Sequence, residues 1–393
     1  MPDTIYLDSA ATTPLHPIAL EAMLPYLTGR FGNPSATYGL AREAQKAIDD
    51  ARKAVASVLG CRTSDIVFTS GGTESINTSL KGVAFAQMKA RAGNHIVTTA
   101  VEHHAVLHTC NYLEQYGFEV TYLPVDAYGM VDPDDVARAI TEQTVLVSVM
   151  QANNEVGTIQ PVAEIAKLTG ERARALHKRI PVHTDAVQAA GALPIDVDSL
   201  GVDLLSLSGH KFGGPKGTGA LFIRRGTPFA PQISGGGQER QRRAGTENVA
   251  GTVGIGVALR LAEESRVASV EAMTELRDRF IEAIMSTIPD SRLNGHPTER
   301  LANNINVSFK GVRGDKLVLE LDRHGIAASA GAACGSSTWE PSHVLLAMGL
   351  GMPDVVGGLR LSLSAENGDS DLEGLMAVLP EAVASLRPVA AAS

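Results

Sequence analysis

The segment that decides the fold covers residues 202–217 and reads VDLLSLSGHKFGGPKG. Its apolar first half predicts a buried strand, and its glycine-rich second half predicts a turn that leaves room around Lys211. Ser208 and His210 flank this lysine, and both side chains can hold an anion. A buried lysine amine forms Schiff bases with carbonyl cofactors, because desolvation lowers its pKa and frees its lone pair. The alternative is an exposed lysine in a solvated loop.

Short β-rich runs alternate with helical patterns on both sides of this segment. The expected strands cover residues 66–70, 95–99, 120–123, 145–149, 182–184, 204–207 and 219–223. This alternation is typical of an α/β fold with a mostly parallel seven-stranded sheet and helices on both faces. The seventh strand follows the sixth after a turn that is too short for a parallel crossover, so we expect it to run antiparallel.

The pattern changes after about Val249 to long helices, with expected strands at 304–309 and 359–363 among shorter helices. We therefore expect two domains. The large domain covers residues 15–259, and a smaller α+β domain combines residues 1–14 with 260–393, including a mobile loop at about 329–341.

The composition sets limits on the function. The chain has 393 residues, of which 44% are hydrophobic and 20% charged, as in ordinary globular enzymes. Its net charge of -9 argues against a nucleic-acid surface. Since no apolar run approaches the roughly 18 residues that cross a membrane, and the first residues lack signal-peptide features, we expect a cytoplasmic protein that binds neither membrane nor nucleic acid.

The chain has three cysteines, which cannot form a disulfide framework and include no metal-like pair. Cys110 falls in a helical pattern, and Cys61 follows a glycine that is expected to end a helix, so both are expected to be structural. Cys334 lies in residues 329–338, which read SAGAACGSST. Small residues do not pack firmly, so this thiol is expected to be mobile and reactive; an incidental loop cysteine is the alternative.

Polar residues follow the expected strands, and ligands bind at the carboxyl ends of parallel strands. Gly72 and Thr73 follow the first strand at a helix start, where free amides bind phosphate. His103 follows the second strand and could stack on an aromatic cofactor or move protons. His104 and His108 have metal-ligand spacing, but the rest of a zinc site is missing, so we expect no metal.

Two further strand ends add polar groups. Asn154 lies in a polar turn after the fourth strand that can hydrogen-bond a carboxylate. Asp185 ends the fifth strand, where a buried carboxylate is costly unless it meets a cation, such as a protonated ring nitrogen. A helix N-cap is the alternative role for Asp185. The joint occurrence of these groups with Lys211 is more specific than any one of them.

Together these residues resemble the class V aminotransferase family of pyridoxal-phosphate enzymes, and within it the cysteine desulfurases of the nitrogen-fixation and iron–sulfur-cluster type. The resemblance runs from YLDSAATTP at 6–14 to LRLSL at 359–363. Its most specific parts are SGHK at 208–211, NNEVG at 153–157 and GGGQER at 235–240. The stretch around Cys334 resembles the branch with a long mobile cysteine loop. The family has fold type I and forms homodimers, with the N-terminal strand packed on the small domain.

The resemblance also implies roles. Lys211 would hold pyridoxal 5′-phosphate as a Schiff base and remove the substrate α-proton, His103 would stack on the ring and shuttle protons, and Cys334 would take the sulfur of L-cysteine as a persulfide, releasing L-alanine. The other implied contacts are Asp185 with the ring nitrogen, Gln188 with the ring hydroxyl, Thr73, Ser208, His210 and a second subunit's Thr246 with the phosphate, and Asn154 and Arg360 with the substrate carboxylate.

Two departures leave details open. Ala330, Ala332 and Gly335 stand near the cysteine where relatives carry more serine and threonine. We also expect no tail after the last helix as long as the one with which relatives dock a scaffold. A sulfur acceptor protein, such as an iron–sulfur scaffold, is therefore expected without being identified. Selenocysteine lyase, aminotransferase and epimerase activities could reuse the pocket, and a non-enzymatic protein on a decayed enzyme fold is the alternative from another class.

Overall fold

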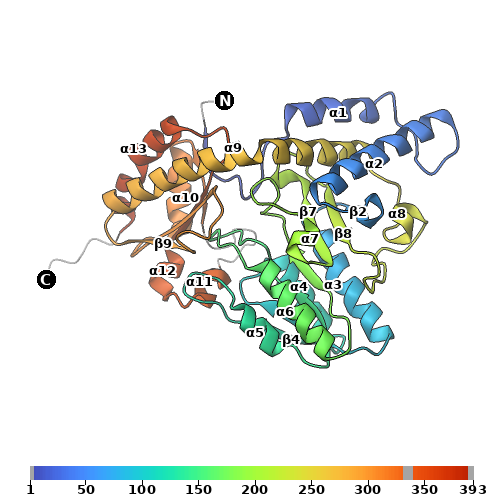
Figure 1. The fold of residues 1–393 in the computed structure, drawn as a ribbon. Helices are drawn as coiled ribbons and strands as arrows, with labels where there is room; N and C mark the ends of the chain where they lie inside the picture. The colour runs from blue at the N-terminus through green and yellow to red at the C-terminus, as the bar shows by residue number, and fades with distance from the viewer. Residues whose placement is uncertain (1–3, 331–339, 388–393) are drawn as a thin grey trace.

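The computed structural model describes residues 4–330 and 340–387, and Figure 1 shows a large lobe joined to a smaller one. The large lobe is built on a seven-stranded sheet in the order β2-β8-β7-β6-β5-β3-β4. Its strands are β2 (Ile66–Thr69), β3 (His95–Thr99), β4 (Glu119–Leu123), β5 (Thr144–Ser148), β6 (Val182–Asp185), β7 (Leu204–Ser208) and β8 (Gly219–Ile223). All seven expected strands are therefore present.

The neighbours from β4 to β7 pair in parallel, whereas β8 runs antiparallel to both β7 and β2. The expected antiparallel seventh strand is confirmed. The α/β fold is confirmed with it, since helices cover both faces of a mostly parallel sheet. Apart from β8, all strands point the same way, so their carboxyl ends lie along one edge.

Alternating side chains of the strands divide between two hydrophobic clusters. Val67 and Leu221 face a cluster with α3 (Gly72–Lys89) and α4 (His104–Glu114). Phe68 and Phe222 face the other cluster. The helices on that side include α2 (Gly39–Val58), α5 (Pro133–Ala139), α6 (Val162–Ala175), α7 (Val197–Leu200) and the first part of α9 (Val249–Thr287). The sheet is thus buried on both faces, as parallel strands require.

The smaller lobe has a four-stranded sheet in the order β12-β13-β10-β9, and a separate pair in which β1 runs parallel to β11. The strands are β1 (Ile5–Tyr6), β9 (Ser291–Asn294), β10 (Asn304–Phe309), β11 (Ile326–Ala327), β12 (Ser329–Ala330) and β13 (Gly358–Ser362). The helices are α10 (Gly314–Arg323), α11 (His343–Ala347), α12 (Met352–Val356) and α13 (Asp369–Leu386). Leu7 joins the core of this lobe, so the N-terminal strand packs there.

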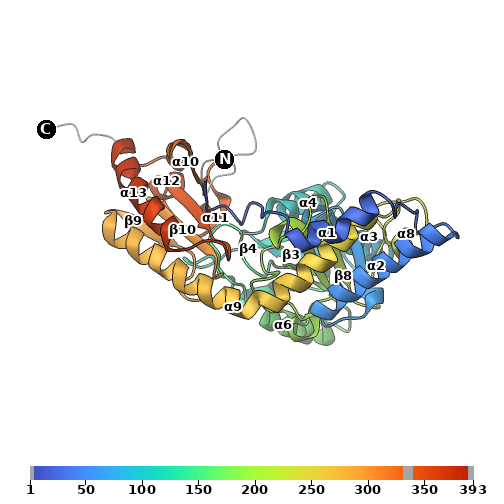
Figure 2. The same ribbon diagram turned by 90° about the horizontal axis from the view of Figure 1, so that it is seen from above.

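The 39-residue helix α9 connects the two lobes, and Figure 2 shows it running from one lobe into the other. Ile255 and Leu259 pack in the core of the large lobe, and Leu276 and Phe280 pack in that of the small lobe. The expected boundary between residues 259 and 260 falls inside this continuous helix, so the division into domains stays a prediction.

The remaining elements lie on the large lobe. They are α1 (Pro17–Leu27), α8 (Gln238–Gln241) and two single 3₁₀ turns, η1 (Thr63–Asp65) and η2 (Gly209–Lys211). Within α8, Glu239 and Arg240 have φ angles of 45° and 56°, in the left-handed region that is strained for residues with side chains. Among the described residues, no helix is both long and apolar enough to cross a membrane.

Candidate active site

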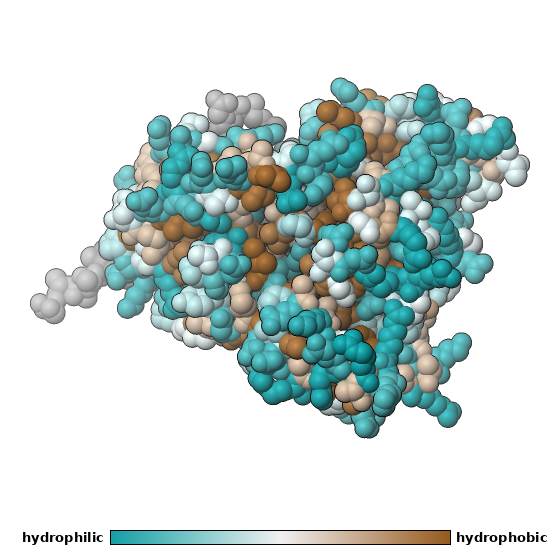
Figure 3. Space-filling view, in the orientation of Figure 1, coloured by the Kyte–Doolittle hydropathy of each residue, from teal (hydrophilic) through white to brown (hydrophobic). Residues whose placement is uncertain are grey.

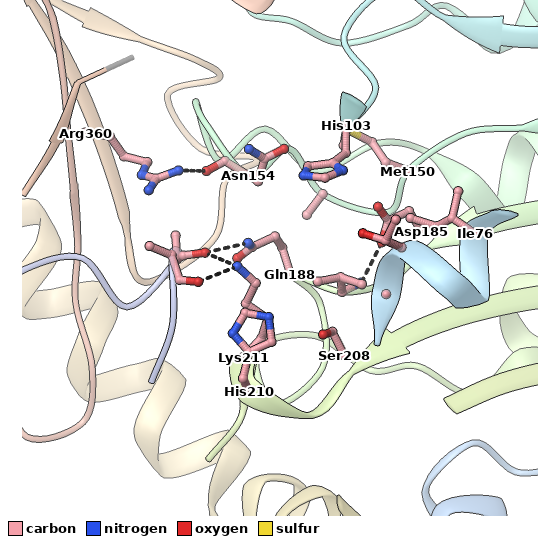
Figure 4. A pocket seen from close by; sticks show the side chains of 16 residues that line it. Ile76, His103, Met150, Asn154, Asp185, Gln188, Ser208, His210, Lys211 and Arg360 are labelled. Carbon is pink, nitrogen blue, oxygen red and sulfur yellow. Dashed lines mark hydrogen bonds between the residues drawn. The ribbon is translucent and has the colours of Figure 1, made fainter. Parts of the chain in front are cut away.

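A cavity of about 350 Å³ opens at the carboxyl edge of the large sheet. Figure 4 shows its walls, with His103 opposite Lys211, and Arg360 at the other end from Asp185. It brings together most of the residues that the sequence singled out: Gly72, Thr73, His103, Asn154, Asp185, Gln188, Ser208, His210, Lys211 and Arg360. The nine residues other than Arg360 come from positions 72–211, and they meet here because they lie at or just after the ends of strands that end at the same edge.

Two predicted residues remain, Thr246 and Cys334. Thr246 lines a separate pocket near β2 and β8, together with Ser70 and Gly217, and does not line the cavity of its own chain. Cys334 lies outside the described residues, as does most of the predicted loop at 329–341. The first two residues of that predicted loop form β12, which pairs with β13.

Lys211 lies in the 3₁₀ turn that follows β7, and its side chain enters the cavity. Its Nζ donates hydrogen bonds to the carbonyl oxygens of Ala10, at 2.5 Å, and Ala11, at 2.9 Å. Burial, aided by the positive charge of Arg360, lowers the pKa of Lys211 to about 8. About a tenth of the amine is therefore a free base at pH 7, far more than for an ordinary lysine, and a Schiff-base lysine needs this form.

Asp185 is 5% exposed at the end of β6. Its Oδ1 accepts a hydrogen bond from the backbone amide of Val187 at 2.9 Å, and among the described residues it forms no ion pair. Burial raises its pKa to about 6. The chain makes a short turn after Asp185, and the next helix begins only at Val197, so the alternative role as the N-cap of an α-helix does not apply.

His103 caps the N-terminus of α4. Its Nδ1 accepts a hydrogen bond from the amide of Ala105 at 3.0 Å, which assigns the proton of the neutral imidazole to Nε2. Burial and the charge of Lys211 lower the pKa of His103 to about 4. His103 therefore presents an uncharged ring to the cavity, suited to stacking on an aromatic ligand.

Arg360, on β13, reaches the cavity from the small lobe. Its Nη1 donates to the carbonyl oxygen of Asn154 at 3.0 Å, and its Nη2 pairs with Oδ1 of Asp8 at 2.8 Å. Among the described residues, its buried Nε has no hydrogen-bond partner. A guanidinium that is held by its neighbours but keeps a free donor is suited to binding a carboxylate.

A second hollow of about 400 Å³ adjoins the cavity at the start of α3. Thr73, Ser208, His210 and Lys216 line it, together with the amides of the first turn of the helix. A methyl group at Gly72 would come within 2.8 Å of Val187 and 3.3 Å of Ser208, so a larger residue here would displace these neighbours. Helix-start amides, hydroxyl groups and a lysine suit a phosphate.

These two spaces fit pyridoxal 5′-phosphate. The phosphate would lie against Thr73, Ser208 and His210, the ring against His103, and its protonated nitrogen beside Asp185, whose buried carboxylate otherwise lacks a cation. Gln188 also lines the cavity, where its Nε2 donates to the carbonyl oxygen of Ala10 at 3.0 Å.

The ring of His104 lies beside the rings of His108 and His343. Its centroid is 5.1 Å from that of His108 and 4.6 Å from that of His343. Even so, among residues 4–330 and 340–387 no group of three or more His, Cys, Asp or Glu side chains could hold a metal ion.

Sequence reasoning missed several residues at the site. Asp8 fixes Arg360, and Ala10 and Ala11 contribute only backbone carbonyls, for which residue type carries no signal. Asp8 lies in the 6–14 segment that carries the resemblance, which was the available signal. Glu102, adjacent to His103, is fully buried and was not predicted to matter.

The comparisons with known proteins agree with this geometry. The model of the family described as aminotransferase class-V matches residues 5–375. The chain belongs to this family, whose enzymes use pyridoxal phosphate. A cysteine desulfurase IscS from Methanosarcina thermophila is 53% identical over 383 residues, covering 98% of this chain and 93% of the relative.

Solved structures give the same result. One titled NIFS-LIKE PROTEIN has a TM-score of 0.91 and 38% identity, over 98% of this chain and all of its own. Another, titled SspA in complex with cysteine, has a TM-score of 0.80 and 38% identity, over 92% of this chain and 99% of its own. The fold of the whole described chain is therefore that of the NifS-like enzymes.

Proposed function

We propose that the chain is a pyridoxal-phosphate-dependent cysteine desulfurase, which converts L-cysteine into L-alanine and passes the sulfur to Cys334 as a persulfide. The observation that carries the proposal is the pairing, in one cavity, of a deprotonatable Lys211 with a buried Asp185 that lacks a cation. The names of the relatives direct the chemistry toward cysteine.

The cofactor would be held by Lys211 as a Schiff base and by the residues that fit its ring and phosphate. When bound, pyridoxal phosphate supplies a ring that withdraws the electron pair left on the substrate Cα after its proton is removed. Asp185 supports this withdrawal because its carboxylate favours a protonated ring nitrogen. Gln188 would donate a hydrogen bond to the ring hydroxyl.

The substrate carboxylate would bind Arg360 and the side chain of Asn154, at the end of the cavity farthest from Asp185. Asp8 keeps the guanidinium in place beside the cavity. This fixes the orientation of the amino acid, so that Cα lies near the amine of Lys211, which would take the α-proton and later return one to the product.

The reaction balances without an external oxidant. The substrate Cβ–S bond breaks, an S–S bond forms to Cys334, and Cβ gains a hydrogen, so carbon is reduced while sulfur is oxidised. The uncharged His103 would donate a hydrogen bond from Nε2 to the departing sulfur. A thiolate is needed as the nucleophile, and burial raises the pKa of both Cys61 and Cys110 to about 12, which makes those two unsuitable.

The protein is further proposed to act as a homodimer. The helix α1 and the segment after it expose Ile18, Leu20, Leu24, Leu27 and Phe31, the last at 72%, and Figure 3 shows hydrophobic residues gathered over this region. A second copy of the chain would cover them and bring its Thr246 toward the phosphate site. The position of Thr246 outside the cavity of its own chain supports this arrangement.

The persulfide would be passed to an acceptor protein, for which an iron–sulfur scaffold is the candidate. With free thiols and no disulfide among its described cysteines, the protein is proposed to work in the cytoplasm.

Intact-protein mass spectrometry after brief incubation with L-cysteine tests the proposal. Wild type should gain one sulfur and release one alanine per sulfur, whereas Cys334→Ser should gain none. Sulfur release that is unchanged in Cys334→Ser, or release of alanine without cysteine as substrate, would overturn it. Selenocysteine offered in parallel separates desulfurase from lyase activity.

A further inference from the structure

Glu102 lies in the turn between β3 and α4, immediately before His103. It is 0% exposed, yet it does not line the cavity, so it cannot touch a ligand there. A buried acidic residue carries a large desolvation cost unless its environment compensates it. Because Glu102 is buried outside the cavity, any effect on the site must act through the residues that it contacts.

The side chain joins the ends of two strands. Oε1 of Glu102 accepts hydrogen bonds from the hydroxyl of Thr99, at the end of β3, and from the backbone amide of Met150, just after β5, both at 2.9 Å. Met150 lines the cavity, and the turn that it begins carries Asn154. Glu102 thus connects the wall that holds His103 with the wall that binds the substrate carboxylate.

The backbone makes a third connection. The carbonyl oxygen of Glu102 is 2.9 Å from Nε2 of His343, on α11. In the same turn, the carbonyl oxygen of Val101 accepts from Nδ2 of Asn153 at 2.9 Å. Hydrogen bonds to three other parts of the chain therefore hold the turn at residues 99–103. The side chain of Glu102 makes one of these connections, to Met150.

Among the described residues, no cation pairs with the carboxyl group of Glu102, and its Oε2 has no hydrogen-bond partner. The titratable groups that face it are Asp185 on β6, Cys110 on α4 and, through the backbone, His343 on α11. None of them supplies a positive charge, since burial also lowers the pKa of His343. Burial, with the charge of Asp185, raises the pKa of Glu102 to about 8.

Glu239 provides the contrast within the same chain. This buried glutamate accepts hydrogen bonds from both terminal nitrogens of Arg52, at 2.7 and 2.9 Å. An ionised carboxylate is compensated there. At Glu102, by contrast, two groups donate hydrogen bonds to one carboxyl oxygen and no described cation lies against the group. This environment suits a neutral carboxylic acid.

We propose that Glu102 is a positioning residue that acts as a neutral carboxylic acid, holding the His103 turn against the Met150–Asn154 turn while leaving Asp185 as the ionised group beside the cofactor. A second negative charge close to Asp185 would raise the pKa of Asp185 further and favour its protonated form. The catalytic part of this inference rests on the proposed function; the protonation state does not.

The protonation state is tested by thermal unfolding of cofactor-free protein between pH 5 and 8. The folded state keeps a proton on Glu102 that the unfolded chain loses above its ordinary pKa of 4.5, so wild type loses stability as the pH rises through this window. Glu102→Gln removes this loss. Its melting temperature, relative to wild type, should rise with pH and be at least about 2 °C higher at pH 8 than at pH 5.

Glu239→Gln is the matched control. It should melt below wild type throughout, because it leaves the guanidinium of Arg52 without its carboxylate. If Glu102→Gln behaves like this control, with no rise in relative stability toward pH 8, the carboxyl group of Glu102 is ionised and the proposal fails.

The positioning role is tested by the pair Glu102→Gln and Glu102→Ala. Glutamine keeps an acceptor oxygen without charge, so kcat/KM for L-cysteine should stay within about threefold of wild type, whereas alanine should lower it roughly tenfold or more through displaced walls. Equal loss in both variants would overturn the positioning role. Absence of desulfurase activity in wild type itself would refute the proposed function and leave the melting result standing.

Discussion

In the described part of the chain, two pairs of oppositely charged residues are arranged in opposite ways. Arg52 of α2 and Glu239 of α8 meet directly, with side chains that are 6% and 3% exposed. Lys211 and Asp185 share a cavity without meeting: the amine binds two carbonyl oxygens and the carboxylate binds one amide. In the first pair the two charges compensate each other. In the second pair each charge lacks an oppositely charged partner among the described residues, so both groups can interact with a ligand in the cavity.

The satisfied pair holds a difficult piece of backbone. Glu239 has a left-handed φ angle, and its carboxylate also accepts from the amide of Phe68 at 3.1 Å, while Arg52 donates to the carbonyl oxygen of Ile66 at 2.9 Å. The pair therefore fastens α8 and α2 to β2. Its contribution is structural.

The separated pair costs stability instead. Burial moves the pKa of Asp185 up to about 6 and that of Lys211 down to about 8, so each group favours its uncharged form in the folded protein more than in the unfolded chain. In these two pairs, the paired charges hold elements of the fold together, and the separated charges line the proposed active site.

The largest expected effect is on turnover. Lys211→Ala removes the amine that would hold the cofactor and move the α-proton, so release of alanine from cysteine should fall by roughly 10³-fold or more. Circular dichroism should stay unchanged, since Lys211 fastens no core element. Lys53→Ala, on the exposed face of α2, is the control; a turnover in Lys211→Ala within tenfold of wild type would break the comparison.

The next effect is on stability alone. Arg52→Ala leaves Glu239 buried without its partner, and urea unfolding should show a loss of about 3–5 kcal/mol. The protein that remains folded should keep its turnover within about twofold, because neither residue reaches the cavity. A loss below about 1 kcal/mol would mean that the paired charges do not hold the fold.

The smallest effect has a defined pH dependence. In cofactor-free protein, wild-type stability falls as the pH rises from 3.8 to about 6, because the folded state retains a proton on Asp185 that the unfolded chain has released. Asp185→Asn lacks this cost, so it should gain up to about 3 kcal/mol relative to wild type across that window and no more above it. Chemical unfolding at pH 4, 5, 6 and 7 would measure the gain, and a gain that does not depend on pH would contradict the assignment.

The sequence carried enough information for the large sheet and for one side of the site. Short apolar runs between helical patterns predicted all seven strands. Because Lys211, Asp185 and His103 lie at or after strand ends, the topology of the sheet brings them together. The two-residue strands β1, β11 and β12 had no such signal, because two residues show no periodicity.

The side of the site that the small lobe and the N-terminal segment form could be predicted from the sequence only in part. Arg360 came from the family resemblance, since an arginine on a strand of a second sheet gives no hint that it will reach the first. The carbonyl groups of Ala10 and Ala11 and the burial of Glu102 depend on tertiary packing. Whether a glutamate is paired, like Glu239, or unpaired, like Glu102, cannot be read from its neighbours in the chain.

The most direct test of the account is borohydride reduction of the protein after incubation with pyridoxal phosphate, followed by peptide mapping by mass spectrometry. The account predicts a single pyridoxyl group on Lys211, and much weaker labelling of Asp185→Asn. Labelling of another lysine such as Lys216, or no labelling of folded wild type at saturating cofactor, would contradict it.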